Sequence, residues 1–273
     1  MFEWEPLVDT TKADIQACLD VWTSVLQISL GLRIKYAYAK GSALKPWDSS
    51  IDYVPIISDV DIHIMLQDSN GLFPNSDDTF AEAMALSQEY EARFMEIRPE
   101  HLHIPRSQLV LIDKLSEILN YVPPRVQDVR IIIGEFPEPF FPTMDTIRRI
   151  DHENLLSLTD FVSRIPNRIV DRTGFDFWSI IREMTWRVSP SPIRLLTQTA
   201  EDPIDVWSWN RTRIVRELRV QDYDAIADHY RDYYTAGWKL FLSGFTSSAD
   251  FRQTLSNGYY VLQKCIKAVE NIK

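Results

Sequence analysis

The stretch that decides the fold reads IKYAYAK at residues 34–40, Gly-Ser at 41–42 and SDVDIHIM at 58–65. Apolar residues alternate with other residues in the first and third pieces, and this alternation predicts two β-strands. The Gly-Ser pair ends the first strand and predicts a turn. Sixteen residues, 43–58, separate that turn from Asp59.

Asp59 and Asp61 share one face of the second strand, because residues two apart in a strand point the same way. Their positions lie roughly 6.6 Å apart at about 3.3 Å per residue. Two carboxylates on one face repel each other, and a cation between them removes the repulsion. Mg²⁺ takes a few carboxylates together with water and phosphate oxygens. The pair therefore predicts a site for divalent cations, the alternative being a hairpin with an exposed acidic strand.

The Gly-Ser turn supplies a second element of a site. Gly41 allows the backbone to approach a ligand closely, since glycine has no side chain to obstruct it. Exposed N–H groups at such a turn, together with the Ser42 hydroxyl, can hold phosphate. A phosphate-binding turn thus precedes a candidate metal-binding strand.

These residues resemble the nucleotidyltransferases related to DNA polymerase beta, which carry a strand, a Gly-Ser turn and then Asp-apolar-Asp. The resemblance covers about the first half of the chain. It implies that Asp59 and Asp61 hold two Mg²⁺ ions, while Gly41 and Ser42 hold the β- and γ-phosphates of a nucleoside triphosphate. The connection is longer than the family's, so we interpret residues 45–52 as an inserted loop. We expect limited proteolysis to cut near residues 137–142, or near the loops at 45–57 and 67–78.

The family often carries a third acid on a later strand. Residues 126–133 (VQDVRIII) predict a strand beside that of Asp59. We therefore expect Asp128 to be the third carboxylate, which completes the metal site or accepts the proton of the acceptor hydroxyl. Asp113 is the alternative, although an acid at the start of a helix has an ordinary role there.

Composition limits the other possibilities. The chain has 273 residues, 45% of them hydrophobic, which is enough for one large or two modest domains. The net charge of −10 argues weakly against a long nucleic acid as partner and suits a small or cationic acceptor. No run of about 18 apolar residues predicts a membrane span, and the N-terminus does not read as a signal peptide.

The two cysteines, Cys18 and Cys265, stand far apart in helix-like segments and without metal-ligand spacing. We expect a reducing, cytoplasmic setting, with a disulfide between them as the alternative.

A domain boundary is expected at residues 137–142 (PEPFFP), because three prolines in six residues exclude a helix or a central strand. The predicted fold class is α+β: a small mixed-sheet catalytic domain at 1–141 and an all-helical bundle at 142–273. The helices expected in the first domain are 10–31, starting at Thr10 or Thr11, 79–98 and 114–121, with a further strand at 108–112. Those expected in the second are 153–164, 175–188, 192–200, 203–219, 222–242 and 249–272.

Local detail is also predicted for helix 79–98. Thr79 and Glu82 have the spacing of a capping box. Its buried stripe is expected to contain Phe80, Met84, Tyr90, Phe94 and Ile97.

Other groups of residues have a functional and an ordinary interpretation. Four arginines at 211, 213, 216 and 219 could bind a triphosphate, but an ion-paired surface explains them as well. Aromatic residues at 230, 234 and 238 could stack on a base, but helix packing gives the same spacing. His63 shares the face of the two aspartates, where we expect a partly exposed structural histidine. His101 and His103 lack the further ligands that a metal site needs.

The layout is similar to the antibiotic nucleotidyltransferases, in which a helical part helps to bind the acceptor. It implies Mg²⁺-dependent transfer of a nucleoside monophosphate, AMP from ATP, to a hydroxyl of a small molecule such as an aminoglycoside. Two alternatives stay open. One is a toxin-type enzyme that modifies tRNA or protein, and the other is a non-catalytic nucleotide-binding module.

Overall fold

The computed structural model describes residues 4–68, 70–73, 76–112 and 121–272. The chain forms two compact units, and each contains two separate segments. The sheet unit consists of Met1–Leu44 and Ser58–Phe140, and the helical unit consists of Lys45–Ile57 and Phe141–Lys273.

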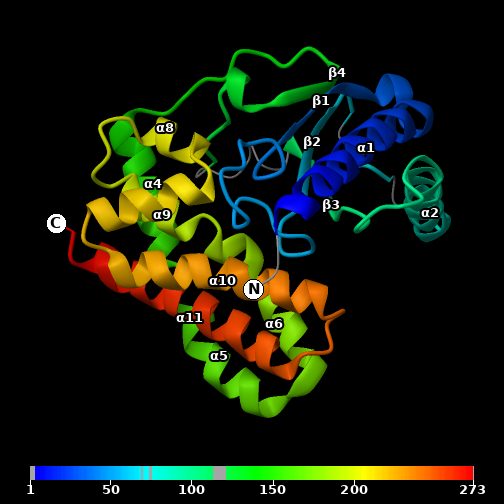
Figure 1. Ribbon diagram of the computed structural model, residues 1–273. Helices are drawn as coiled ribbons and strands as arrows, with labels where there is room; N and C mark the ends of the chain where they lie inside the picture. The colour runs from blue at the N-terminus through cyan, green and yellow to red at the C-terminus, as the bar shows by residue number, and fades with distance from the viewer. Residues whose placement is uncertain (1–3, 69, 74–75, 113–120, 273) are drawn as a thin grey trace. The chain divides into compact units, whose positions relative to one another are not determined.

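The sheet unit is built on four strands in the order β3-β2-β1-β4 (Figure 1). β1 runs antiparallel to both β2 and β4, whereas β2 and β3 are parallel. The expected small mixed sheet is therefore confirmed. Its elements are α1 (Glu5–Ser29), η1 (Gly31–Arg33), β1 (Ile34–Lys40), β2 (Val60–Leu66), α2 (Thr79–Ile97), β3 (Ser107–Leu111), η2 (Val126–Asp128) and β4 (Arg130–Gly134).

Helix α1 lies along the sheet and packs beside α2 (Figure 1). Trp22 of α1 donates its indole N–H to Ser107 Oγ at the start of β3, 2.5 Å away, and stacks on Tyr90 of α2 with ring centroids 4.6 Å apart. Ile62 and Ile64 of β2 are fully buried. Because side chains alternate along a strand, Asp61 points to the face opposite these isoleucines.

Helix α1 begins at Glu5, five residues before the predicted start. Pro6 lies in its first turn, where a missing backbone N–H costs nothing. Thr11 is buried inside the helix, and its hydroxyl donates to the Leu7 carbonyl over 2.7 Å instead of capping an end. The predicted cap at Thr10 or Thr11 is thus wrong.

Two predictions for α2 are wrong. No capping box forms, because Asp78 is the N-cap residue and makes no side-chain cap bond. Tyr90 and Phe94 are buried as expected, and Leu86 joins them. The other members of the predicted stripe are exposed: Phe80, Met84 and Ile97. A helical apolar repeat shows which face can pack, but it does not show how far along the helix a neighbour covers that face.

The last strand, β4, is shorter than predicted and pairs with β1 instead of β2. β4 begins at Arg130, and residues 126–128 form a 3-10 turn. Arg130 pairs with Ala39 of β1, so β1 lies between β4 and β2. The expectation that this strand lies beside that of Asp59 is wrong. The predicted helix 114–121 falls almost wholly outside the described residues.

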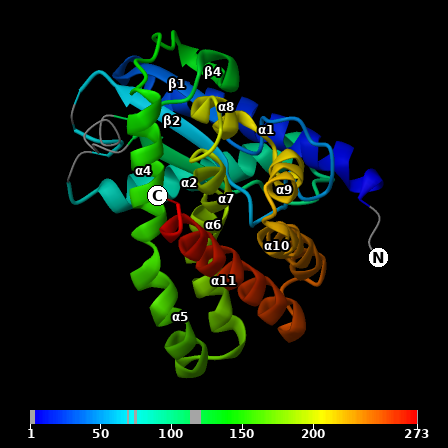
Figure 2. The same ribbon diagram turned by 90° about the vertical axis from the view of Figure 1, so that its left-hand side faces the viewer.

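The helical unit contains eight described helices, of which α10 and α11 lie side by side (Figures 1 and 2). Tyr230, Tyr234 and Trp238 of α10 are almost fully buried, which confirms their interpretation as core. The helices are α4 (Met144–Leu156), α5 (Thr159–Asp171), α6 (Phe177–Val188), α7 (Ser191–Leu196), α8 (Pro203–Ser208), α9 (Arg211–Val220), α10 (Asp224–Leu242) and α11 (Ser248–Glu270).

Two predicted helices are divided in the structure. The pattern at 203–219 splits because the Asn210 side chain accepts a hydrogen bond from the Arg213 backbone N–H over 2.8 Å and starts α9. The pattern at 153–164 covers the end of α4 and the start of α5. No helix in the described part of the chain has both the length and the apolar character needed to cross a membrane.

The segment Lys45–Ile57 has no helix or strand, as expected of a loop, but it is part of the helical unit. Asp52 is only 2% exposed and accepts four hydrogen bonds. They come from the backbone N–H groups of Asp48 and Ser49, at 2.7 and 2.9 Å, and from the N–H and hydroxyl of Thr212, both at 2.8 Å. A buried carboxylate is stable only when its oxygens are satisfied in this way.

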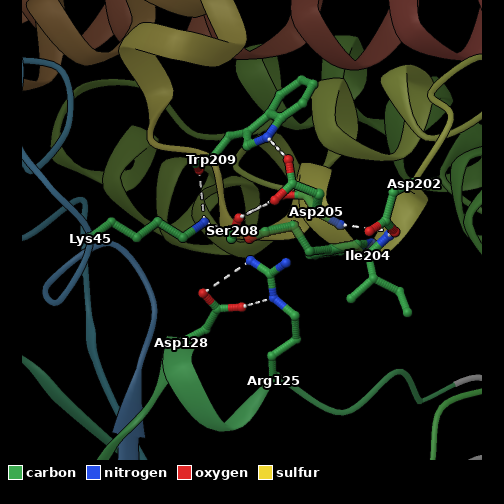
Figure 3. Close-up of polar contacts among 9 residues, drawn as sticks. Lys45, Arg125, Asp128, Asp202, Ile204, Asp205, Ser208 and Trp209 are labelled. Carbon is green, nitrogen blue, oxygen red and sulfur yellow. Dashed lines mark hydrogen bonds and ion pairs between the residues drawn. The ribbon is translucent and has the colours of Figure 1, made fainter.

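Further contacts hold the same segment on the helices. The Lys45 ammonium donates to the carbonyls of Trp207 and Trp209, at 2.7 and 2.9 Å; the bond to Trp209 is drawn in Figure 3. Trp238 of α10 donates its indole N–H to the Ser50 carbonyl at 2.7 Å. The segment is therefore an integral part of the helical core.

Replacing Asp52 with Asn should destabilise the protein by about 2 kcal/mol, because an amide nitrogen cannot accept the hydrogen bonds of buried N–H donors. Chemical denaturation followed by circular dichroism measures the loss. Asp160→Asn is the matched control, since the Asp160 side chain is 92% exposed. A loss for Asp52→Asn no larger than that of the control contradicts the anchoring role.

A second buried acid lies among α4, α7 and α8. Asp151 accepts hydrogen bonds from the Thr197 hydroxyl at 2.9 Å and from the Trp207 indole N–H at 3.1 Å. Arg194 Nε lies 3.8 Å from its other oxygen. Burial raises the pKa of Asp151 from 3.8 to about 6, although these partners oppose the rise.

Asp151 should make stability depend on pH. The unfolded chain loses this proton near pH 3.8 and the folded chain near pH 6, so the folded state loses stability as the pH rises between those values. Relative to Asp151→Asn, the parent should lose about 2 kcal/mol between pH 4 and pH 7. Denaturation of both proteins across this range measures the difference. Asp145→Asn, on the exposed side of the same helix, should show no such trend, and a flat difference for Asp151→Asn contradicts the assignment.

Candidate functional site

The Gly-Ser turn and the aspartate strand meet in the structure. The Leu44 N–H donates to the Gly41 carbonyl over 3.1 Å and closes the turn. Gly41 has φ +91°, and a side chain built on it would place its Cβ 2.5 Å from Asp61 Oδ2. The carboxylate of Asp61 thus lies directly against the turn, and the positive φ at residue 41 favours glycine. Asp59 stands just before β2, two residues from Asp61.

Asp59 has a cationic partner. The guanidinium of Arg106 donates to Asp59 Oδ1 and forms an ion pair with it. The Val60 N–H donates to the Arg106 carbonyl over 2.9 Å, which ties the start of β2 to the start of β3. The sequence gives no signal for this residue, because a single Arg before a short strand is ordinary. Arg106 offsets one of the two like charges.

A row of polar residues crosses the sheet beside the turn. Lys40 on β1 and Gln108 on β3 are both register partners of Asp61 on β2. Register partners point to the same face of a sheet, so the three side chains share the face of the site. Neither Lys40 nor Gln108 can be found from sequence alone, since strand register depends on tertiary pairing.

Behind this row lies a buried hydrogen-bonded cluster. His63 is 4% exposed, and its Nδ1 lies 3.1 Å from the Tyr38 hydroxyl, which in turn lies 3.3 Å from the Tyr121 hydroxyl. Burial, together with a smaller contribution from the charge of Lys40, lowers the pKa of His63 to about 3. His63 is therefore neutral at physiological pH, and the expectation of a partly exposed histidine is wrong.

Asp128 lies at the same end of the sheet but on the other side of β1. Its carboxylate accepts hydrogen bonds from Arg125 Nε and Nη2, at 2.7 and 3.3 Å (Figure 3). The pairing of Ala39 with Arg130 brings Asp128 level with the Gly41 turn. Two strand spacings, roughly 9.6 Å, then separate its strand from β2. Asp113 lies outside the described residues.

No group of three or more His, Cys, Asp or Glu side chains within the described residues has the arrangement of a metal site. The two aspartates that come together, Asp59 and Asp61, are oxygen donors of the kind that Mg²⁺ prefers. Gln108, which neighbours Asp61, adds a side-chain amide and not a carboxylate.

The arginine-rich helix α9 is occupied by local contacts. Arg211 is buried, donates to the Ile51 carbonyl over 3.0 Å and lies over the Tyr234 ring. The other three arginines form ion pairs, which confirms the ordinary interpretation for them: Arg213 with Asp205, Arg216 with Glu217, and Arg219 with Asp224 and Asp228.

The remaining candidates also have structural roles. His103 lies against the buried carboxylate of Asp14, with Nδ1 3.6 Å from Oδ2. Cys18 and Cys265 are both free and buried, so the alternative of a disulfide between them is wrong.

Comparisons of the chain with protein-family models, with curated proteins and with solved structures gave no match.

Substitution of Gly41 by Ala should destabilise the turn for two reasons. The new Cβ collides with Asp61, and alanine must adopt a positive φ that it disfavours. Gly174→Ala is the control, since its φ of +73° is similar and nothing lies within 4 Å of the added Cβ. The unfolding free energy should fall by about 1–3 kcal/mol more for Gly41→Ala than for the control. Adding Asp61→Ala should recover most of that excess in a double-mutant cycle. Equal losses for the two glycine variants contradict the close contact.

Proposed function

We propose that this chain is a Mg²⁺-dependent nucleotidyltransferase, which moves a nucleoside monophosphate, AMP from ATP, to a hydroxyl of a small acceptor. The observation that supports this most directly is the position of the Asp61 carboxylate against the Gly41 turn. It brings a candidate phosphate-binding turn and a candidate metal-binding strand together. The sequence resemblance to the nucleotidyltransferases agrees with this reading.

The carboxylate oxygens of Asp59 and Asp61 are suitable ligands for Mg²⁺. Asp59 keeps acceptor sites beside its ion pair with Arg106, because an ionised carboxylate has about four lone-pair positions. Mg²⁺ held by Asp59 and Asp61, in two ions as the resemblance implies, would neutralise the charge of the phosphate oxygens and polarise the reacting phosphorus.

The residues of the turn bind and orient the nucleotide. Backbone N–H groups at Gly41 and Ser42 hold the β- and γ-phosphates, as they do in other turns with a positive φ. An acceptor oxygen attacks the α-phosphorus in line, a new P–O bond forms, and the bond to the bridging oxygen breaks. Pyrophosphate then leaves with the bonding electrons. Catalysis in this scheme comes from positioning and charge neutralisation.

The proton of the acceptor hydroxyl passes to a carboxylate. Asp128 stays our prediction for that role, because it lies level with the turn at the same end of the sheet. Its partner Arg125 fixes the carboxylate in one orientation.

A small cationic acceptor such as an aminoglycoside suits this protein best. The net charge of −10 favours cations over polyanions near the surface. An aminoglycoside carries several ammonium groups and several hydroxyls, so one molecule satisfies both requirements.

A non-catalytic nucleotide-binding module is the second candidate. Two observations favour it: Asp59 already has Arg106 as partner, and the described neighbour of Asp61 on β3 is Gln108. Such a module binds a nucleoside triphosphate but releases no pyrophosphate.

The test is incubation with each labelled nucleoside triphosphate, Mg²⁺ and a panel of aminoglycosides, followed by mass measurement of the products. Transfer should add one nucleoside monophosphate to the acceptor and release one pyrophosphate. Asp59→Asn and Asp61→Asn should each lower turnover by at least about 100-fold, since each removes a charged group that acts in the transition state. Asp77→Asn, an exposed acid, should leave turnover unchanged.

Full turnover in either Asp59→Asn or Asp61→Asn contradicts the proposed site. Nucleotide binding without pyrophosphate release, for every acceptor of the panel, supports the binding module instead. Loss of turnover in Asp128→Asn with unchanged nucleotide affinity supports the role of Asp128 toward the acceptor.

A further inference from the structure

Lys40 is a cationic residue at the site, and the proposed function assigns it no role. It is the last residue of β1 and directly precedes Gly41. Its register partner is Asp61, so its side chain shares the face on which the Asp61 carboxylate meets the turn. Its position therefore belongs to the site and not to the outer surface.

Unlike Arg106, Lys40 forms no ion pair with an acid among the described residues. Arg106 pairs with Asp59, whereas the Lys40 ammonium makes no hydrogen bond or ion pair with any residue of the described chain. Lys40 thus contributes a positive charge to this face that no described side chain takes up.

A partly buried lysine beside a candidate phosphate-binding turn favours an anion. Partial burial removes some of the water that stabilises the charge, and a bound anion replaces it. Gln108 on the same face is an uncharged amide, and the acid of that face, Asp61, has its carboxylate against the Gly41 turn. The anion that fits must approach from the side of the Gly41 turn.

We propose that Lys40 binds the triphosphate chain of the nucleotide and holds it through departure as pyrophosphate. This inference rests on the proposed function and adds to it a determinant of specificity. An ammonium at this point favours ligands with a β-phosphate over nucleoside monophosphates. Because the ammonium is a point charge on a flexible stem, Arg in its place should keep most of the effect.

The test is titration calorimetry of ATP, AMP and inorganic pyrophosphate against the full chain, first with EDTA and then with Mg²⁺. Lys40→Met should lower the affinity for ATP and for pyrophosphate by at least about tenfold, and the affinity for AMP by less than about twofold. ATP and pyrophosphate place a β-phosphate charge beside the ammonium, whereas AMP does not. Lys40→Arg should stay within about threefold of the parent. Lys35→Met is the matched control, because Lys35 is exposed on the same strand, and it should behave as the parent. Thermal unfolding of each variant confirms that it is folded.

Unchanged ATP affinity in Lys40→Met, or equal losses for ATP and AMP, overturns the role of Lys40. The proposed function then still stands if the parent transfers a nucleoside monophosphate and needs Asp59 and Asp61. A parent that binds neither ATP nor pyrophosphate under either condition overturns both. Should Lys40→Met prove unfolded, Lys40→Gln gives the same comparison, since its amide keeps a polar side chain but carries no charge.

Discussion

The close approach of the Asp61 carboxylate to the Gly41 turn is the constraint on which the rest of the site depends. A positive φ turns the backbone of Gly41, and the missing side chain leaves the space that Asp61 Oδ2 occupies. Antiparallel pairing of β1 with β2 fixes this contact, because Lys40 and Asp61 are register partners. Tyr38 and Lys40 take their positions from β1, and Asp61 and His63 from β2.

Charge is distributed unevenly over this face. Asp59 has a close cationic partner in Arg106, whereas Asp61 faces a lysine across the register with which it makes no described ion pair. The buried His63 behind them stays neutral. The charge of Asp59 is therefore offset by Arg106 before any ligand arrives.

The sequence allowed the local features to be predicted and missed the long-range ones. Alternation and turn residues correctly predicted β1, β2 and the Gly-Ser turn, and helical spacing predicted α10 and α11. The predicted position of Asp128 was wrong, because nothing within residues 126–133 shows which strand they pair with. Arg106 and Lys40 were missed for the same reason, since their importance follows from register. The burial of Asp52 within Lys45–Ile57 depends on partners such as Thr212, far along the chain.

The interleaved arrangement of the two units has a consequence for synthesis on the ribosome. Asp52 and its partner Thr212 are separated by 160 residues, so the segment Lys45–Ile57 leaves the ribosome long before α9 exists. At 5–20 residues per second, the wait is about 8–32 s. During that interval the sheet unit can form while its central connection stays unanchored. A fragment that stops at the proline-rich boundary would keep the connection in this immature state permanently.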